Sequence, residues 1–393
     1  MKAIVKTDEL KKALEKVNLS KKQQTLPVLS YAHAKLANGK MVITTSDLQK
    51  AIRVEVDSSN SEDYAFLLPR HTLYRFLYSG KNTLTNKDTI ILNQDTKTNV
   101  ISAEREKIGK VNLYTPQEKV FPPIPYADKL TWHTFDSKWF CRMLKIVSHA
   151  CAKEESRPVL TGVVFKDGTL ASADGFRLAV LNDKKLAFGL GEQNAIVHYE
   201  TVDYAIKLFA KEDKLDIAFE WVDDSSFSTS KEPKPKVLQR IYFKSGNTSL
   251  MSELVMGNFP NYEQLIPKTY NCKASFSTPL MIQRLNMIDI KDVSGGILRL
   301  IFHKNEQNEE ECLIQSKLND EFNNDAYNYN LSLPIKLLST DMGKIGVNHT
   351  YLSEAIKPFS MCEVELINLS SPIKITGDIE GLTIIVMPMF LQW

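Results

Sequence analysis

The chain has 393 residues, of which 43% are hydrophobic and 24% are charged, and its formal net charge is +2. These values are ordinary for a globular protein, and the length allows two to four domains. No segment has the apolar length of a membrane span, and the N-terminus lacks the apolar run of a signal peptide, so both are excluded. We therefore expect a cytoplasmic protein.

Charge is distributed unevenly along the chain. Residues 1–128 carry 20 Lys and Arg against 14 Asp and Glu, a net +6, and residues 269–393 carry 10 against 15, a net −5. The first and last thirds would attract each other if they met between two molecules. Chance variation in the charges of solvent-exposed surfaces explains the net charge of each third, taken alone, about as well as such an interface does.

The cysteines are odd in number, scattered, and without Cys-x-x-Cys spacing. This usage favours reduced, buried thiols over disulfides or metal ligands. The five are Cys141, Cys151, Cys272, Cys312 and Cys362.

The first third opens with a predicted strand and an amphipathic helix, for which Thr7 is the predicted N-cap. A hairpin with an Asn38-Gly39 turn follows, then a second helix. The predicted elements are strand Lys2–Lys6, helix Asp8–Val17, the hairpin within Thr25–Asp47, strand Ala51–Val56, helix Arg70–Tyr78, and strands Thr89–Leu92, Asn99–Ala103 and Lys110–Leu113.

The second third repeats this order. Its hairpin comprises a buried strand from Val159 to Phe165, a turn at Asp167-Gly168 and a return strand from Leu170 to Ala173. The other predicted elements are strand Lys129–His133, helix Asp136–Ala150, helix Glu200–Lys211, a loop over Asp223–Lys236, and strands Val237–Phe243 and Thr248–Leu254.

The last third has the same order again, with an acidic loop, Asn305–Glu311, inside its hairpin. The predicted elements are strand Cys272–Ser277, helix Pro279–Ile288, hairpin strands Ile297–His303 and Cys312–Leu318, helix Asn348–Phe359, and strands Val364–Ile367, Ile373–Ile375 and Leu382–Met387. The loop leaves the register of this hairpin open.

An internal repeat underlies this order. Pro158-Val159-Leu160-Thr161 matches Pro27-Val28-Leu29-Ser30, and Ser172-Ala173-Asp174 matches Thr45-Ser46-Asp47. The sequence therefore predicts three domains of similar build, over residues 1–128, 129–268 and 269–393.

No catalytic motif accompanies the repeat. The sequence has no Gly-x-Ser-x-Gly elbow and no His-Glu-x-x-His, and its histidines lack ligand spacing. Asp47 and Asp174 occupy equivalent positions, and carboxylates that cap turns explain them better than catalysis does. We predict no catalytic residue, no cofactor and no metal.

Basic residues recur on the predicted helices, away from their apolar faces. Each alone is explained by solvation, but as a set on repeated elements they suggest a surface for phosphate backbone without base readout. They are Lys11, Lys12, Lys16, Arg75, Lys138, Arg142, Lys145, Lys207, Lys211 and Arg284.

Several short motifs, in order and spacing, resemble those of the bacterial DNA polymerase III beta subunit, the replication sliding clamp. They are Thr25-Leu26-Pro27-Val28-Leu29, Ala173-Asp174-Gly175-Phe176-Arg177-Leu178-Ala179-Val180, Phe259-Pro260-Asn261-Tyr262, Leu265-Ile266-Pro267-Lys268 and Val386-Met387-Pro388-Met389. The resemblance implies an α+β fold of three repeated domains, each with two helices packed on antiparallel sheets. Two chains would join head to tail, first domain to third, into a six-domain ring around double-stranded DNA.

The resemblance also implies that the chain is no enzyme but tethers one, since a ring holds its partners at the DNA. The implied partners are the DNA polymerase III alpha subunit, the clamp loader, and other replication and repair proteins that insert an apolar peptide between the second and third domains. By resemblance the pocket comprises Leu160, Ala173, Gly175, Phe176, Arg177, Leu178, Pro260, Gln264, Leu265, Asn348, Tyr351, Ile385, Met387, Pro388, Met389 and Phe390.

The chain departs from the family pattern at several of these positions. Gln264 stands where the family often has arginine, Ala173 where it has threonine, and Phe390 where it has a basic residue; Gln392-Trp393 extends the usual end. On the DNA side, Gln23 replaces an arginine, and Lys21 and Lys22 offer compensation. We expect an intact ring with altered peptide preference.

Two other interpretations stay open. The departures at Gln264 and Phe390 favour a clamp-like paralogue that binds partner peptides without being the replicative clamp. The other interpretation is an unrelated β-rich enzyme built on the repeat. Such an enzyme would need a cluster of polar residues with shifted pKa values, and no residue spacing in the sequence indicates such a cluster.

Overall fold

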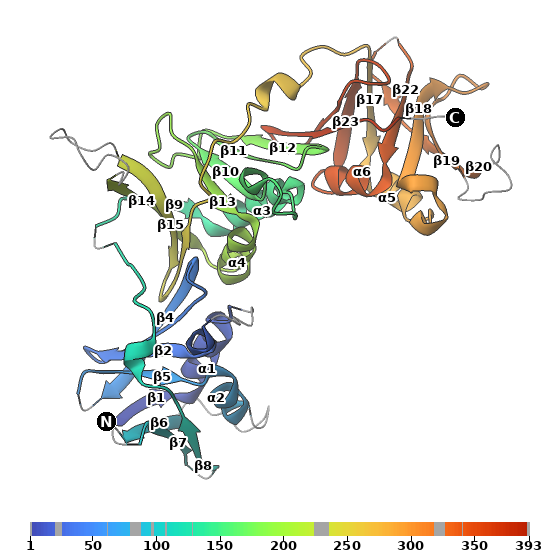
Figure 1. Cartoon of the computed structure of the whole chain (residues 1–393). Coiled ribbons are helices and arrows are strands. Elements are labelled where there is room, and N and C mark those ends of the chain that lie inside the picture. Colours follow the sequence, from blue (N-terminus) through green and yellow to red (C-terminus); the bar gives the residue numbers. More distant parts are fainter. Residues whose placement is uncertain are drawn as a thin grey trace. The chain divides into compact units, whose positions relative to one another are not determined.

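The computed structural model describes residues 2–19, 26–60, 62–78, 88–95, 98–106, 108–127, 129–223, 236–317, 327–339 and 341–390 (Figure 1). The chain forms two compact units, one made of Met1–Cys141 and Asp203–Leu254, the other of Arg142–Val202 and Val255–Trp393. Its described helices accompany antiparallel sheets, which confirms the predicted α+β class. The loop predicted over Asp223–Lys236 lies, apart from its two ends, outside the described residues.

The first unit is built on one twelve-stranded sheet, whose main path runs β8-β7-β6-β1-β4-β16-β15-β14-β9, with β2, β3 and β5 paired off it. Its strands are β1 (Lys2–Lys6), β2 (Ala32–Ala37), β3 (Lys40–Ser46), β4 (Lys50–Asn60), β5 (Tyr64–Leu68), β6 (Thr89–Asp95), β7 (Val100–Arg105), β8 (Gly109–Tyr114), β9 (Trp132–Asp136), β14 (Lys214–Asp223), β15 (Lys236–Ser245) and β16 (Thr248–Glu253). Pairing of β4 with β16 makes the sheet continuous from the first third of the chain into the second.

Two helices of the first unit, α1 (Thr7–Lys16) and α2 (Arg70–Leu77), bury their leucines. Leu10 and Leu14 of α1 and Leu73 of α2 are at most 1% exposed. The prediction that Thr7 caps α1 is wrong, because Lys6 is the N-cap and Thr7 is the first helical residue. The Thr7 N–H already donates to the Asp88 carbonyl at 3.0 Å, and the Thr7 side chain is buried.

The second unit holds a nine-stranded sheet, β13-β10-β11-β12-β25-β24-β23-β17-β21, and a four-stranded sheet, β20-β19-β18-β22. Their strands are β10 (Gly162–Lys166), β11 (Thr169–Ala173), β12 (Arg177–Asn182), β13 (Ala195–His198), β17 (Cys272–Ser277), β18 (Ile297–Lys304), β19 (Glu310–Lys317), β20 (Tyr327–Pro334), β21 (Lys336–Leu337), β22 (Gly343–Asn348), β23 (Met361–Leu366), β24 (Ile373–Gly377) and β25 (Leu382–Val386). Here β12 pairs with β25, so the second and third thirds also share a sheet.

Four further helices complete the described part of the chain: α3 (Ser137–Val147), α4 (Tyr199–Phe209), α5 (Thr278–Leu285) and α6 (His349–Ile356). The chain passes between the two units within α3 and again within α4. The helix predicted to end at Ala150 ends as an α-helix at Val147 and continues as one 3₁₀ turn, Ser148–Ala150.

Hydrogen bonds confirm the internal repeat. Thr45 Oγ1 donates to the Val17 carbonyl at 2.9 Å, and the equivalent Ser172 Oγ donates to the Val147 carbonyl at 2.5 Å. In both copies a hairpin strand is thus tied to the end of the preceding helix. Asn38 and Gly39 both have positive φ, 51° and 73°, as a type I′ turn requires, so the first hairpin is confirmed as well.

A 3₁₀ turn precedes each hairpin, at Pro27–Ser30, Pro158–Leu160 and Ser294–Gly296. The prediction that Val159 and Leu160 begin the strand is therefore wrong. Proline fixes a φ that suits the first position of a helical turn, and the strand begins only at Gly162. The third hairpin is confirmed, with Leu300 opposite Ile314, and its loop is shorter than predicted because β19 begins at Glu310.

Candidate functional site

The residues predicted to form the peptide pocket all lie in the second unit. They come from the 3₁₀ turn before β10, the turn between β11 and β12, the segment that follows β16, the start of α6, and β25 with its continuation. Pairing of β12 with β25 places Leu178 opposite Ile385 and Arg177 opposite Val386. The second and third copies therefore meet at the predicted position.

Apolar side chains form the floor of this surface. Leu178 and Ile385 are 2% and 1% exposed and belong to one buried cluster, against which Ala173 packs. The segment after β16 crosses the same cluster with Phe259 and Tyr262. Leu160, on the adjoining 3₁₀ turn, is also buried.

The chain beyond β25 is held by two backbone hydrogen bonds. The Met387 N–H donates to the Phe176 carbonyl at 2.8 Å, and the Met389 N–H donates to the Gly346 carbonyl at 2.9 Å. Met387, Pro388 and Met389 are half-buried. The methionines, whose side chains adapt to irregular neighbours, are thus fixed at the backbone between the two copies.

Large apolar side chains are exposed around this floor. Phe176 is 55% exposed, Leu265 45% and Phe390 84%, whereas Gln392 and Trp393 lie outside the described residues. Phe176 stacks on Tyr351 of α6, with ring centroids 6.1 Å apart and planes inclined by 29°. Exposed apolar groups gathered at one place mark a surface that binds something apolar more often than a surface that stays solvated.

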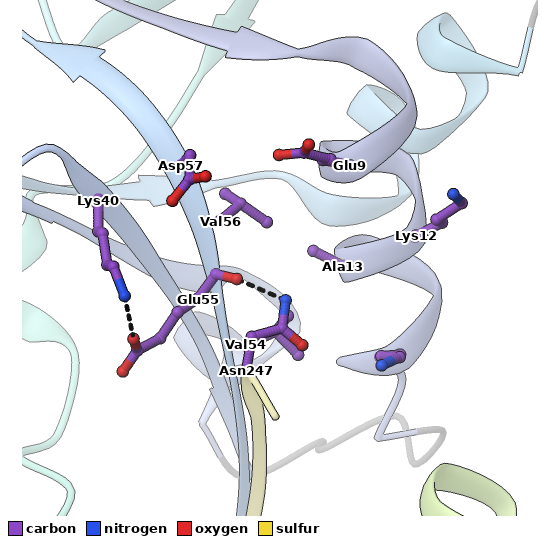
Figure 2. Close-up of a pocket in the computed structure, with 10 residues that line it drawn as sticks. Glu9, Lys12, Ala13, Lys40, Val54, Glu55, Val56, Asp57 and Asn247 are labelled. Atoms are coloured by element: carbon purple, nitrogen blue, oxygen red, sulfur yellow. Dashed lines mark hydrogen bonds and ion pairs between the residues drawn. The ribbon is translucent and has the colours of Figure 1, made fainter. Parts of the chain in front are cut away.

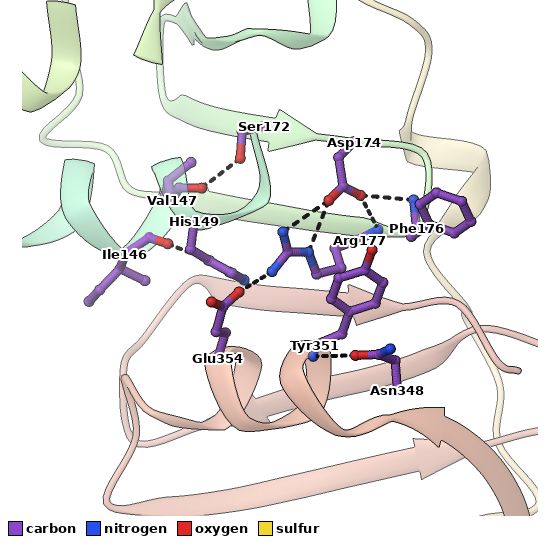
Figure 3. Close-up of polar contacts among 10 residues, drawn as sticks. All are labelled: Ile146, Val147, His149, Ser172, Asp174, Phe176, Arg177, Asn348, Tyr351 and Glu354. Carbon is purple, nitrogen blue, oxygen red and sulfur yellow. Dashed lines mark hydrogen bonds and ion pairs between the residues drawn. The ribbon is translucent and has the colours of Figure 1, made fainter. Parts of the chain in front are cut away.

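A polar network underlies the stacked rings (Figure 3). Arg177 Nε donates to Asp174 Oδ2 at 3.0 Å, and Arg177 Nη1 pairs with Glu354 of α6. The guanidinium also lies 4.4 Å from the centre of the Tyr351 ring. One arginine therefore connects the turn after β11 to the helix that carries the aromatic wall.

Asp174 caps its turn, as predicted. Its Oδ1 accepts the N–H groups of Phe176 and Arg177, and in the first copy Asp47 Oδ1 likewise accepts those of Gln49 and Lys50. The positive partner is repeated too, since Lys50 Nζ lies 3.0 Å from Asp47 Oδ2. These carboxylates stabilise turns in both copies.

Asn348, also predicted for the pocket, has a structural role, because its side chain caps α6 by accepting the Tyr351 N–H at 3.1 Å. Sequence reasoning missed Glu354 and His149. Glu354 follows Tyr351 by about one helical turn, a spacing that places both on one face of α6 and that offered a usable signal. His149 Nδ1 lies 2.6 Å from the Ile146 carbonyl oxygen, and burial lowers the pKa of His149.

The predicted DNA-binding residues of the first unit are mostly exposed but partly engaged. Lys12 lies 3.6 Å from Asp8, and Lys138 lies 2.8 Å from Asp213. Lys12 shares a cavity of about 410 Å³ with Glu9 and Asp57, between α1 and β4 (Figure 2). Positive charge on this face of α1 is thus offset locally by carboxylates.

The other predicted basic residues are distributed over several helices. Lys207 of α4 lines a cavity of about 450 Å³ with Arg70 and Tyr74 of α2 and Leu14 of α1. Lys138, Arg142 and Lys145 are exposed at a spacing that puts them on one face of α3. Of the rest, Arg75 and Lys211 are exposed, Lys11 stacks over Tyr78, Lys16 contacts Thr248, and Arg284 donates to the Ser332 carbonyl, whereas Lys21, Lys22 and Gln23 lie outside the described residues.

No group of His, Cys, Asp or Glu suited to a metal ion occurs among the described residues. The five cysteines are buried free thiols, as predicted, and burial raises the pKa of Cys141 and Cys362 to about 11. Within the described ranges, no helix is long and apolar enough to cross a membrane.

Comparison with known proteins agrees with this geometry. Residues 134–261 match the family model of the DNA polymerase III beta subunit, central domain. The beta sliding clamp of Chlamydia muridarum is 23% identical over 290 residues, which cover 73% of this chain and 74% of that protein. The chain is thus similar to the bacterial DNA polymerase III beta subunit.

Solved structures extend the likeness to the whole chain. The DNA polymerase III subunit beta from Pseudomonas aeruginosa superposes with a TM-score of 0.83, at 19% identity, over 100% of both chains. The beta subunit from Thermotoga maritima gives a TM-score of 0.79, at 19% identity, over 99% of both. The chain therefore has the sliding-clamp fold throughout, although most residues differ.

Proposed function

We propose that this chain is a DNA sliding clamp that closes as a head-to-tail homodimer around double-stranded DNA and itself makes no covalent change. The observation that carries the proposal is the repeated clamp fold over the full length of the chain, with two helices in each third. A closed ring needs no base-specific contact, because topology holds it on the duplex and weak phosphate contacts let it slide.

The DNA-facing surface in this proposal consists of the basic helices. Exposed cations at Arg75, Arg142, Lys145, Lys207 and Lys211 would lie near phosphates. Lys12 and Lys138, which have carboxylate neighbours, would exchange those partners for phosphate. Such exchange makes binding weak and strongly dependent on salt, as sliding requires.

The surface between the second and third copies is the proposed peptide site. Its buried floor of Leu178 and Ile385 offers apolar contact, while Phe176, Leu265 and Phe390 offer exposed apolar groups that a peptide would cover. Its occupants in this proposal are segments of the DNA polymerase III alpha subunit, of the clamp loader, and of other replication and repair proteins. Half-buried methionines suit several peptides in turn.

The second candidate, a clamp-like paralogue, is favoured by two positions of the proposed site. Phe390 is 84% exposed where the family often has a basic residue, and Gln264 is exposed where the family often has arginine. A paralogue would bind partner peptides without serving the replicative polymerase. Loading onto primed circular DNA, followed by a test of processive synthesis, separates the two candidates.

The decisive test of the peptide site is fluorescence anisotropy with a labelled peptide of the Gln-x-x-Leu-Phe type. We expect saturable binding to the full chain and a loss of about tenfold in affinity on Met389→Ala, since truncation removes apolar contact from the site. Leu369→Ala, a change at an exposed loop residue, is the matched control. Equal affinity in Met389→Ala and in the unchanged chain would refute this site.

A further inference from the structure

The sheet of the first unit carries a further cavity, of about 400 Å³, lined by residues that the proposed function does not use. Strands β2, β3 and β4 form its base, and the segment 118–126 forms its wall. Cations and aromatic rings line it together, among them Lys35, Arg53, Lys119, Phe121 and Tyr126.

The internal repeat identifies what this cavity corresponds to. His33 lies opposite Thr44, which lies opposite Arg53, and in the second copy Val164 lies opposite Ala171, which lies opposite Val180. The two rows are equivalent, because His33 and Val164 each come six residues after the proline of the shared motif. Thr44 and Ala171 each come three residues before the turn aspartate, and Arg53 and Val180 six residues after it.

In the second copy this row belongs to the apolar floor of the proposed peptide site, under Phe259 and Tyr262. In the first copy the covering segment again supplies two rings. Phe121 lies 5.3 Å from the His33 ring, and Tyr126 lies 5.2 Å from the Arg53 guanidinium. The first copy therefore has the same arrangement with a polar row, His-Thr-Arg, in place of Val-Ala-Val.

Two carboxylates of the chain itself already contact this row of side chains. Glu118 Oε1 lies 2.8 Å from His33 Nε2, and Glu55 Oε1 lies 3.3 Å from Arg53 Nη2. The Arg53 Nε atom is buried and makes no hydrogen bond within the described part of the chain. Lys35 and Lys119 add two exposed positive charges, so the lining keeps an excess of positive over negative groups.

We propose that this cavity is a second binding site, which takes a carboxylate side chain of an extended peptide whose neighbouring residue is apolar. The carboxylate would contact Arg53 and Lys119, and the apolar neighbour would pack on Phe121 and Pro122. The choice of a peptide rests on the proposed function, since the equivalent row in the second copy lies under the proposed peptide site. The choice of an acidic residue rests on the side chains of the first copy alone.

The test is anisotropy with fluorescein-labelled Gly-Leu-Asp-Phe-Asp-Gly, which lacks the Gln-x-x-Leu-Phe spacing. We expect saturable binding to the full chain and no binding of the matched peptide with Asn in place of Asp. Arg53→Val, which installs the residue found at the equivalent Val180, and Lys119→Gln, at an exposed position, should each weaken binding about tenfold. Met389→Ala should leave this binding unchanged.

Several outcomes would overturn the proposal. They are no binding of the acidic peptide, equal binding of the Asn peptide, or unchanged affinity in Lys119→Gln and Arg53→Val. Loss of binding in Met389→Ala would assign the peptide to the other site. Competition by free glutamate or inorganic phosphate as effective as by unlabelled peptide would make this a small-anion site. The Gln-x-x-Leu-Phe peptide tests the proposed site in the second unit, and the acidic peptide tests the cavity in the first unit. A failure of one proposal is therefore distinguishable from a failure of the other.

Discussion

At the scale of single residues, the Arg177 side chain makes a polar contact between the second and third copies of the repeat. Its side chain and that of Asp174 are 10% and 11% exposed, whereas Glu354 is 40% exposed. Arg177→Gln leaves Asp174 without its cation in a largely dry position. We expect a loss of about 1–3 kcal/mol in the free energy of unfolding, measured by urea denaturation.

Glu354→Gln is the matched variant for this prediction. Glu354 is more exposed, and Arg177 keeps Asp174 when Glu354 is neutralised, so the loss should be well below that of Arg177→Gln. Equal losses in the two variants would mean that the Glu354 contact, rather than Asp174, dominates the network.

His149 gives the second prediction at this scale, a dependence on pH. Burial lowers the pKa of His149 below its ordinary value of 6.5, so the unfolded chain binds a proton there more readily than the folded one. The free energy of unfolding is therefore not reduced by His149 above about pH 7. It falls as the pH drops through 6.5 toward the pKa of His149 in the folded state. The groups facing the ring include Arg177, Glu354 and Asp174.

The measurement for His149 is the urea midpoint at pH 7.5 and at pH 5.5, in the unchanged chain and in His149→Gln. Glutamine keeps a polar group but has no proton to gain, so the fall in midpoint between the two pH values should be smaller in the variant. An identical fall in both proteins would assign the dependence to other groups.

At the scale of elements, the pairing of β12 with β25 positions the proposed peptide site. Gly381, in the turn before β25, has φ of +76°, and a Cβ there would lie 2.0 Å from the Asn182 carbonyl oxygen at the end of β12. Gly381→Ala must therefore separate these strand ends. We expect a loss of about 1–3 kcal/mol in stability by urea denaturation and a weaker Gln-x-x-Leu-Phe peptide complex.

Gly381→Ala combines an unfavourable backbone conformation with a steric clash against Asn182, and Gly191→Ala separates these two effects. Gly191 also has positive φ, +60°, but a Cβ there would meet nothing within 4 Å. It should cost only the strain of the backbone conformation, about 1 kcal/mol, and leave peptide affinity unchanged. If both variants lose equally, the close approach to Asn182 does not govern the pairing.

The elements that the sequence predicted well are those whose signal is local. The Asn38-Gly39 turn, the hairpin ending at Asp174 and the helices with clear apolar faces follow from side-chain periodicity and turn chemistry. Strands β5, β12, β13, β14 and β22 were missed or left unassigned, and each pairs with a strand that is not its neighbour in the sequence. Strand β20 was missed as well, although among the described strands it pairs with its neighbour β19.

The candidate site was less accessible to sequence reasoning. The repeat and the family resemblance brought Leu178, Ile385 and Tyr351 together, but not Glu354, whose partner Arg177 lies far away in the chain. The row of His33, Thr44 and Arg53 could not be predicted from the sequence either, because these residues become neighbours only when their strands pair. Side chains joined across strands leave no spacing along the sequence.

At the scale of the whole molecule, the proposed ring requires that sheet edges of two copies meet. Strand β8 ends the strand path of the first unit, and among described strands it pairs with β7. Tyr114 on this strand is 75% exposed, and Ile108 just before it is 46% exposed. An exposed strand edge that carries large apolar side chains tends to pair with another chain unless a partner already covers it.

The last third of a second copy is the proposed cover, and its net charge of −5 matches the +6 of the first third. The double variant Ile108→Glu with Tyr114→Glu removes apolar contact and adds charge that the acidic third repels. We expect the dimer dissociation constant to rise at least about tenfold by sedimentation equilibrium. Leu369→Glu, an exposed apolar residue in a loop, is the control and should leave the dimer intact. A double variant that stays dimeric would place the interface elsewhere, and dissociation in both variants would point to net charge rather than to the β8 edge.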